Sequence, residues 1–328
     1  MINIAILGTG KIIPESVAAI QASKKFNVSL IWARPHSRDK AAALSDRFNV
    51  GRISTDLDEV LADPTIDFVY VGLVNSVHHE YAKKALEAGK NVLLEKPFTT
   101  NFADAKELAD LALSKKLYLF EAVTHIHMPN FYALRDALPS IGKIKMVQCN
   151  YSQYSSRYDN YRDNRVVQPA FDPKCYGGAL QDINIYNLNF VVALFGEPEK
   201  TSYFANLGWN GIDTSGTVFL QYKDFLAQCV GAKDSASPCF LIVQGDNGHI
   251  IVKGSPNEFN SVEIAVRGKE NQTLNLNKFP HRMIHEFVEF GETFENKDYK
   301  KVEDGLKISL AVMKVTEDAA KFAGIRYA

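Results

Sequence analysis

The chain has 328 residues, a formal net charge of −1, 46% hydrophobic residues and 23% charged residues. Single hydrophobic cores stop growing at roughly 250–300 residues, so this length predicts two domains. Acids and bases are interspersed along the chain, which argues against a nucleic-acid-binding protein because such proteins concentrate positive charge.

The first 121 residues alternate between short apolar runs and amphipathic helical stretches. The expected strands read INIAIL, VSLIW, FVYVGL, NVLLE and LYLFE, with a weak sixth near Arg52–Ser54. The expected helices cover Glu15–Lys25, Arg38–Phe48, Val77–Ala88 and Phe102–Ser114. This alternation is typical of right-handed βαβ units. We therefore expect a doubly wound parallel sheet, a Rossmann domain, over residues 1–122.

The pattern changes after Glu121. Between Ile144 and about Val266 the strand candidates are longer, alternate in polarity and are separated by Gly, Asn and Asp. Helical spacing recurs from about Gly178 to Phe195, and again at His281–Phe294 and Val302–Ala323. The sequence thus predicts an α+β domain with an open, mainly antiparallel sheet over residues 123–328.

A glycine turn follows the first strand. In LGTGKII, Gly8 and Gly10 let the backbone approach a pyrophosphate at the start of the next helix, with Lys11 and Ile12 completing the turn. Such a turn alone is equally typical of a purely structural loop. Its position between strand and helix favours dinucleotide binding. Ile13 occupies the third position of the fingerprint, so we expect the helix to lie slightly further from the strand.

The stretch IWARPHSRDK at the tip of the second strand bears on the choice between NAD and NADP. No acidic residue stands between Ile31 and Arg38 to bond a ribose 2′-hydroxyl. Arg34, His36 and Arg38 could instead bind a 2′-phosphate. We expect NADP in preference to NAD; a solvated basic loop is the alternative.

The strand VLLE ends in Glu95, Lys96 and Pro97. Ligands of doubly wound sheets bind outside the carboxyl ends of the strands, and the proline restricts the backbone of Lys96. Lys96 could therefore contact a substrate hydroxyl and the nicotinamide ribose. Alternatively it caps the strand and pairs with Glu95.

A second group of candidate catalytic residues lies in the segment GGALQDINIYNLNF. Asp182 and Tyr186 are four residues apart, so a helix would place both on one face near its start. A tyrosine near a lysine and a carboxylate can donate and accept a proton. The alternatives are a core aromatic at Tyr186 and, at Asp182, an acid favoured by the helix dipole.

Three segments together, GTGKI, VNSVHHEYAKKALEAGKNVLLEKP and GGALQDINIY, resemble the Gfo/Idh/MocA family of NAD(P)-dependent oxidoreductases over essentially the whole chain. Within it the chain is most similar to the dihydrodiol dehydrogenase and glucose–fructose oxidoreductase branch. The resemblance implies a homodimer or homotetramer formed through the C-terminal sheet. It also implies that Asn75 and His78 line the dinucleotide site. Glu95, Lys96 and Pro97 would form the part of the site where cofactor and substrate meet, often with a cis peptide bond before the proline. Asp182 and Tyr186 would be the catalytic pair.

The expected reaction is hydride transfer between the nicotinamide and a secondary alcohol or ketone carbon of a small sugar, cyclitol or diol. Tyr186 would exchange the hydroxyl proton, Lys96 would hold the reacting oxygen, and Asp182 would bond a neighbouring hydroxyl or Lys96. A non-catalytic NAD(P)-binding sensor of the same fold is the alternative. Keeping all three residues favours an enzyme, because a sensor needs no proton donor.

The chain departs from the family pattern at several positions. Val74 and Asn184 stand where the family usually has proline and glycine, and the substrate-side Trp and Arg of related dehydrogenases are replaced by Thr124 and Ile126. The segment SSRYDNYRDNR is expected to border the substrate pocket through Arg157, Tyr158 and Arg162, or else to be a solvated loop.

Other features predict a protein without metal or membrane. His125 and His127 lack nearby acids, so we expect no metal site. The four cysteines form no CxxC pair, which predicts reduced thiols. No apolar run approaches the roughly 20 residues of a membrane span, and Met1 leads directly into a strand rather than a signal peptide. We expect a cytoplasmic protein.

Overall fold

The structure is a computed structural model that describes residues 1–327. The chain divides into two compact units, residues 1–122 with 283–310, and residues 123–282 with the segment that follows 310. All four cysteines are free thiols, as expected. Among the helices formed by the described residues, none is both long and apolar enough to cross a membrane.

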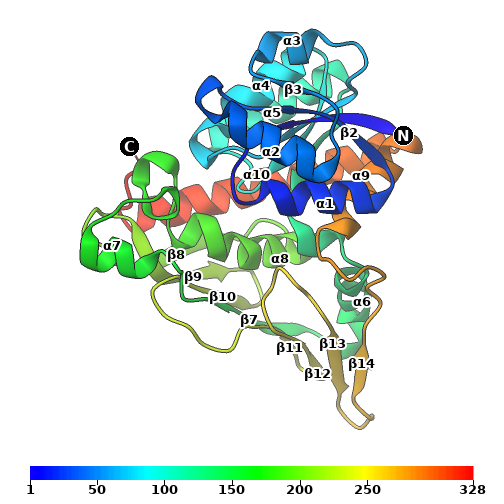
Figure 1. Cartoon of the computed structure of the whole chain (residues 1–328). Helices are drawn as coiled ribbons and strands as arrows, with labels where there is room; N and C mark the ends of the chain where they lie inside the picture. Colours follow the sequence, from blue (N-terminus) through cyan, green and yellow to red (C-terminus); the bar gives the residue numbers. More distant parts are fainter. Residues whose placement is uncertain (328) are drawn as a thin grey trace. The chain divides into compact units, whose positions relative to one another are not determined.

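The first unit contains a six-stranded parallel sheet, which confirms the predicted Rossmann architecture (Figure 1). Its strand order is β3-β2-β1-β4-β5-β6. The chain builds the sheet outward from β1 in one direction and then, starting at β4, in the other, so the topological switch point lies between β1 and β4. The strands are β1 (Ile2–Leu7), β2 (Phe26–Trp32), β3 (Ile53–Ser54), β4 (Phe68–Val71), β5 (Asn91–Glu95) and β6 (Leu119–Ala122). The central strands are buried on both faces, which explains their unbroken apolar runs.

Helices connect these strands: α1 (Ile13–Ser23), α2 (Arg38–Phe48), α3 (Leu57–Ala62), α4 (His78–Glu87) and α5 (Phe102–Lys115). Asn101 caps α5 by accepting a hydrogen bond from the backbone N–H of Asp104 at 2.9 Å. The short helix α3 was not predicted, although its N-cap Asp56 accepts from Asp58 and Glu59.

Residues 283–310 were expected in the second domain but pack with the first unit. They form α9 (Ile284–Glu295) and the beginning of α10 (Tyr299–Phe322). Phe294 meets Phe68 edge to face at 5.1 Å between ring centroids, and Phe290 stacks on Phe120 at 4.6 Å. The apolar face of α9 thus completes the core beneath the parallel sheet, a pairing that chain order does not indicate.

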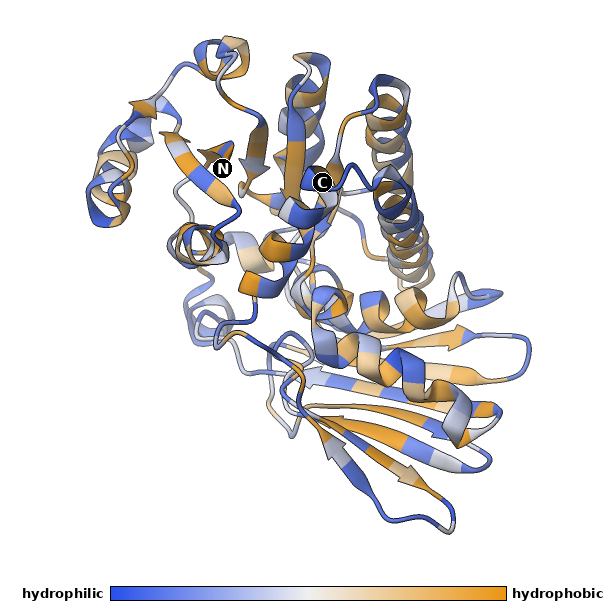
Figure 2. Cartoon of the chain, turned by 90° about the vertical axis from the view of Figure 1, so that its right-hand side faces the viewer, coloured by the Kyte–Doolittle hydropathy of each residue, from blue (hydrophilic) through white to orange (hydrophobic). Residues whose placement is uncertain are grey.

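The second unit contains an eight-stranded sheet in the order β14-β13-β12-β11-β7-β10-β9-β8. Only β7 and β10 pair in parallel, so the sheet is mainly antiparallel, as predicted. The strands are β7 (Ile144–Ser152), β8 (Lys200–Leu207), β9 (Asp213–Gln221), β10 (Leu226–Ala232), β11 (Phe240–Gly245), β12 (Gly248–Lys253), β13 (Val262–Val266) and β14 (Gln272–Leu274). In Figure 2 most of these strands are orange and the turns between them blue.

The predicted helix over residues 178–195 lies on this sheet and begins with a π-helical turn, Leu180–Asn184, before α8 (Ile185–Phe195). Asn184 donates to the Cys229 carbonyl at 2.9 Å, and Asn187 donates to the Val230 carbonyl at 2.8 Å. A Cβ at Gly231 would lie 2.7 Å from the Asn184 Cβ. Asn184, which replaces the glycine usual in the family, therefore anchors the helix to β10, and Gly231 supplies the space.

Two further helices were not predicted: α6 (Pro129–Ala137), in a segment without an assigned element, and α7 (Tyr158–Asn164), in a segment expected as a loop. The stretch SSRYDNYRDNR is therefore not a loop throughout, since α7 occupies its centre. Tyr161 on the inner side of α7 is buried and stacks on Phe171 at 4.8 Å. Burial of this aromatic face accounts for the helix despite the polar sequence.

Candidate active site

The glycine turn lies between β1 and α1. Gly8 has φ +128°, and a Cβ there would lie 2.6 Å from the Gly72 carbonyl oxygen, so the fold itself requires glycine. A Cβ at Gly10, in contrast, would meet nothing closer than 4.0 Å. Gly10 and Lys11 are exposed at the amino end of α1. Glycine at position 10 leaves the backbone open to a ligand, and this geometry fits a pyrophosphate bound at a helix N-terminus.

Ile13, at the third position of the fingerprint, is fully buried. A Cβ at Gly72 would lie 2.5 Å from Ile13 Cδ1 and 2.8 Å from Tyr70 Cε1. Gly72 directly follows β4, the strand beside β1. The space that the fingerprint usually obtains from a small third residue is therefore provided by a glycine after the neighbouring strand.

The basic residues expected to read the ribose follow β2. Pro35–Ser37 form a short 3₁₀ turn between Arg34 and Arg38, which begins α2. The side chains of Arg34, His36 and Arg38 are exposed, and none of them belongs to an ion pair within the described residues. A loop with this charge and accessibility fits the 2′-phosphate of NADP.

His78, which is expected to line the dinucleotide site, is the first residue of α4. Its ring is buried, with Nδ1 2.9 Å from the Pro97 carbonyl oxygen and Nε2 3.2 Å from the Leu73 carbonyl oxygen. Burial lowers the pKa of His78, and the nearby Lys96 cation lowers it further, while the two carbonyls oppose the shift. A neutral His78 thus ties the loop after β4 to the loop after β5. Asn75, half-buried, begins the 3₁₀ turn that precedes α4.

The peptide between Lys96 and Pro97 is cis, as the family resemblance implied. Glu95 is buried and accepts a hydrogen bond from the Tyr70 hydroxyl, which also lies 2.7 Å from Ser16 Oγ. Burial raises the pKa of Tyr70 well above its usual value, so the phenol stays protonated. Glu95 is therefore held from the core side, while Lys96 is half-buried.

A buried carboxyl group behind this loop was missed in the sequence. Glu121 Oε1 accepts the backbone N–H of Phe98 at 3.0 Å, and Ser309 also hydrogen-bonds to Glu121. Burial raises the pKa of Glu121 to about 7; the Glu95 charge adds to this shift and the Lys96 cation opposes it. The sequence did contain a signal for this residue, because Glu121 is an acid near the end of a buried strand. The parallel register places it beside the end of β5, across from Leu94.

In the second unit, Asp182 lies in the π-helical turn and Tyr186 in the first turn of α8. The Asp182 carboxylate forms an ion pair with the buried Lys233 at 2.8 Å. The Tyr186 ring packs against His125 and Tyr151, with centroids 5.7 and 5.8 Å apart. Burial lowers the pKa of His125 to about 3, so this imidazole stays neutral. The sequence did not point to Lys233, or to His125 as a neighbour of Tyr186.

The residues expected to border the substrate lie on and beside α7. Arg162 pairs with Asp163 at 2.6 Å and with Asp159 at 3.1 Å, and all three side chains are exposed. Tyr158 packs against Phe171 at 5.8 Å, and Arg157 precedes the helix. Arg162 is thus engaged at the surface of α7, whereas Tyr158 reaches the aromatic cluster beside Lys233.

A parallel sheet whose order reverses beside a glycine turn is the architecture of dinucleotide-dependent enzymes. Residues 2–123 match the oxidoreductase family with an NAD-binding Rossmann fold, and residues 137–251 match the GFO/IDH/MocA C-terminal domain. The chain belongs to the GFO/IDH/MocA family and is an NAD(P)-dependent oxidoreductase, as the sequence predicted.

Relatives cover the whole chain. It is 31% identical to scyllo-inositol 2-dehydrogenase (NADP(+)) IolU of Bacillus subtilis over 327 residues, 100% of this chain and 98% of the relative. It is 28% identical to trans-1,2-dihydrobenzene-1,2-diol dehydrogenase of Xenopus tropicalis, over 81% of this chain and 79% of the relative, which supports the predicted branch. The fold is similar to that of KijD10, a 3-ketoreductase from Actinomadura kijaniata solved with NADP and TDP-benzene (TM-score 0.82, 22% identity, covering 97% and 98% of the two chains).

Proposed function

We propose that this protein is an NADP-preferring dehydrogenase or reductase that acts on a CH–OH carbon of a small polyhydroxylated molecule, such as a cyclitol, sugar or diol. The cofactor preference rests on the exposed basic loop after β2. This loop contains Arg34, His36 and Arg38, and no acidic residue stands between Ile31 and Arg38. A relative that covers the chain from end to end is an NADP-dependent inositol dehydrogenase, which supports both the cofactor and the substrate class. No observation favours the non-catalytic sensor.

In this proposal the first unit binds the dinucleotide. Backbone groups of Gly8 and Gly10 and the amino end of α1 hold the pyrophosphate, and the basic loop holds the 2′-phosphate. NADP, when bound, supplies or accepts the hydride. His78 acts as a positioning residue, because its buried ring joins the loops that carry Leu73 and Pro97.

The remaining groups exchange the proton. During oxidation Tyr186 takes the proton of the substrate hydroxyl, and during reduction it returns that proton to the carbonyl oxygen. Lys96 holds the reacting oxygen, and its positive charge favours the phenolate form of the tyrosine. Asp182 accepts a hydrogen bond from a neighbouring hydroxyl of the substrate.

Thermal-shift titrations with NADP⁺ and NAD⁺, followed by a polyol and ketose screen with the preferred cofactor, test this function. A ligand that binds only the folded state raises its apparent stability. We expect a larger shift with NADP⁺, and NADP⁺ reduction in the presence of scyllo-inositol or a related polyol. An equal or larger shift with NAD⁺ would contradict the cofactor preference, and the absence of turnover with every polyol and ketose would contradict the substrate class.

We further propose that a second copy of the chain covers the outward face of the eight-stranded sheet. On the inner face Val218, Leu220, Ala227 and Cys229 are completely buried beneath the helix. The register places another set of apolar side chains on the opposite face, and they are exposed: Met146, Phe204, Phe219 and Leu226. A contiguous exposed apolar face of this kind marks an interaction surface.

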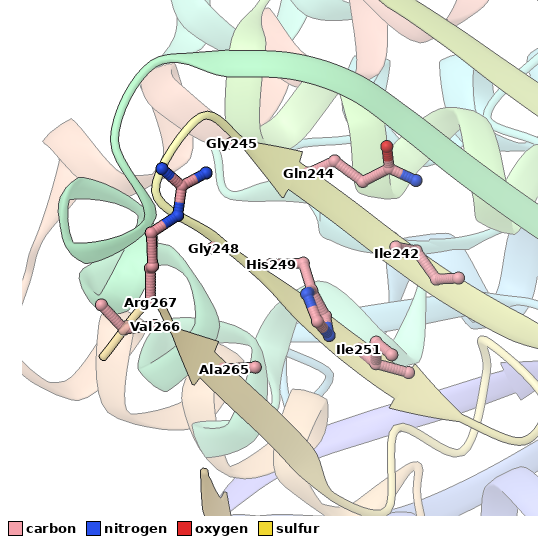
Figure 3. A pocket seen from close by; sticks show the side chains of 9 residues that line it. All are labelled: Ile242, Gln244, Gly245, Gly248, His249, Ile251, Ala265, Val266 and Arg267. Carbon is pink, nitrogen blue, oxygen red and sulfur yellow. The ribbon is translucent and has the colours of Figure 1, made fainter. Parts of the chain in front are cut away.

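The same face is hollowed at β11 and β12 (Figure 3). Ile242, Gln244, His249 and Ile251 line this depression of about 580 Å³ together with Arg267, which directly follows β13. Mixed apolar and polar lining is typical of an interface between protein subunits. The apolar strip and the depression together favour a homo-oligomer formed through this sheet.

A further inference from the structure

Lys233 is a buried lysine in the second unit. It directly follows β10, its backbone N–H donates to the Thr214 carbonyl at 2.8 Å, and its own carbonyl accepts from the Ser155 N–H at 2.8 Å. The side chain is 2% exposed. Lysine is almost never fully buried unless it is paired, so the surroundings of its ammonium group are informative.

Three groups surround this ammonium. Nζ donates to Asp182 Oδ2 at 2.8 Å and to the Ala170 carbonyl at 2.6 Å, and it lies 4.5 Å from the centroid of the Phe171 ring. The first contact is a charge-assisted hydrogen bond and the last a cation–π contact. The ammonium therefore has a defined position, and the Asp182 carboxylate takes its orientation from it.

A second acid, Asp213, lies near Lys233 but has its own donors. It accepts the Leu180 N–H at 2.6 Å and the Tyr203 hydroxyl at 2.7 Å. Burial raises the pKa of Asp213, an effect that these donors and the Lys233 charge oppose. The direct ion-pair partner of Lys233 is accordingly Asp182.

Exposure differs sharply across the ion pair. The Asp182 side chain is 39% exposed, whereas that of Lys233 is 2% exposed. A buried ion pair is weak evidence for stability, because well-packed apolar replacements are often neutral or stabilising. The pair is better explained by the accessible carboxylate, which a ligand can reach, than by its contribution to folding.

We propose that Lys233 is a positioning residue, which holds the Asp182 carboxylate oriented to accept a hydrogen bond from the substrate hydroxyl next to the reacting carbon. This inference rests on the proposed function. Lys233 itself does not touch the substrate. The preferred substrate must then carry two hydroxyl groups on adjacent carbons, because a lone alcohol has no neighbouring hydroxyl to donate to the oriented carboxylate.

Two probe alcohols test the proposal with the full-length protein and NADP⁺: trans-cyclohexane-1,2-diol and cyclohexanol. For the wild type we expect kcat/KM to be about tenfold to a hundredfold higher for the diol, the size of one hydrogen bond to a charged group. Lys233→Met should lower kcat/KM for the diol by about tenfold or more and change that for cyclohexanol about twofold at most. Lys233→Arg should recover part of the preference for the diol, and Lys200→Met, at an exposed position of β8, should retain all of it.

Equal losses for both alcohols in Lys233→Met would overturn the proposal, because a purely structural role affects both substrates alike. If Lys233→Met does not fold, Asp182→Asn decides, since it preserves volume but removes the charge of the acceptor and must lower the preference for the diol severalfold; a preference that survives in full overturns the inference. NADP⁺ binding, measured by fluorescence, should persist in each variant. A wild type that turns over neither the diol nor scyllo-inositol contradicts the proposed function itself, which distinguishes the two failures.

Discussion

The side chain of Glu121 reaches from the end of β6 to the backbone of Phe98, with 3.0 Å between the carboxyl oxygen and the amide nitrogen. This single hydrogen bond attaches the loop that carries Lys96 to the adjacent strand of the sheet. The carboxyl group that makes it is buried, and burial raises its pKa from 4.5 to about 7.

The raised pKa predicts a pH dependence of stability. The folded state retains the Glu121 proton that the unfolded chain loses, so the stabilisation is complete below pH 4.5 and is lost as pH rises through about 7. Between about pH 5 and pH 8 this group should reduce the free energy of unfolding by roughly 2–3 kcal/mol. Glu121→Gln should flatten that decrease in urea-unfolding measurements, whereas Glu270→Gln, at an exposed site, should not. Parallel pH profiles for the wild type and Glu121→Gln would refute the role of this carboxyl group.

The proposed proton exchange predicts the effect of two substitutions. Tyr186→Phe removes the phenolic hydroxyl, and Lys96→Met removes the cation that is proposed to hold the reacting oxygen. Each should lower turnover by roughly 100-fold or more, because general acid–base catalysis contributes about 10²–10⁴-fold. Affinity for the dinucleotide, measured by fluorescence titration, should remain within a few-fold of the wild type. If turnover is unchanged in both variants, neither residue has the assigned role.

The basic loop predicts selective loss of NADP binding. Arg34→Ala and Arg38→Ala should each weaken NADP⁺ affinity by roughly tenfold, because each removes a proposed charged donor to the 2′-phosphate. NAD⁺ lacks this phosphate, so its affinity should change little. Calorimetric titration of both cofactors measures the difference, with Arg47→Ala at the other end of α2 as the matched control. Equal weakening of NADP⁺ and NAD⁺ would argue against recognition of the phosphate.

The space beside Ile13 predicts a specific rescue. Gly72→Ala places a Cβ 2.5 Å from Ile13 Cδ1, so it should destabilise the fold by roughly 1–3 kcal/mol. Ile13→Val removes the methyl group that is contacted, and the double variant should regain part of this loss in urea unfolding. Gly8→Ala should gain nothing from the same partner, because its new Cβ meets the Gly72 carbonyl oxygen at 2.6 Å. Additive effects of Gly72→Ala and Ile13→Val would disprove the steric coupling.

The outward face of the eight-stranded sheet predicts the behaviour in solution. Met146 and Leu226 are directly paired across β7 and β10 and are exposed. The double variant Met146→Lys with Leu226→Lys should lower the mass measured by analytical ultracentrifugation to that of one chain, because lysine side chains disfavour a buried apolar interface. Val166→Lys, exposed beyond α7, provides the control. A wild type that sediments as a monomer at micromolar concentration would rule out the proposed oligomer.

The sequence predicted most of the fold because the information is local. The continuous apolar runs of β1, β4 and β5 and the helical periodicity between them define a parallel sheet without reference to distant residues. The assignment of 283–310 failed because the aromatic side chains of α9 are equally compatible with any apolar surface. Only the folded chain shows Phe290 against Phe120 and Phe294 against Phe68.

In the candidate site, too, residues in local motifs were predicted and residues that meet only through tertiary contacts were not. Lys96, Asp182 and Tyr186 stand in recognisable motifs, whereas Lys233 is 51 residues from its partner Asp182 and carries no local signal. Glu121 looked like the ordinary end of a strand until the register placed it beside β5. Partners supplied by tertiary contacts, and the burial that shifts their pKa values, cannot be read from spacing along the chain.

The contact between Gly72 and Ile13 bears on how nucleotide-binding turns can diversify. A bulky residue is accommodated in the turn because an atom is missing from a different segment, almost 60 residues away along the chain. The allowed size at either position is thus a joint property of the pair. A score given to each position separately does not register this compensation, because the missing atom belongs to the adjacent strand's end.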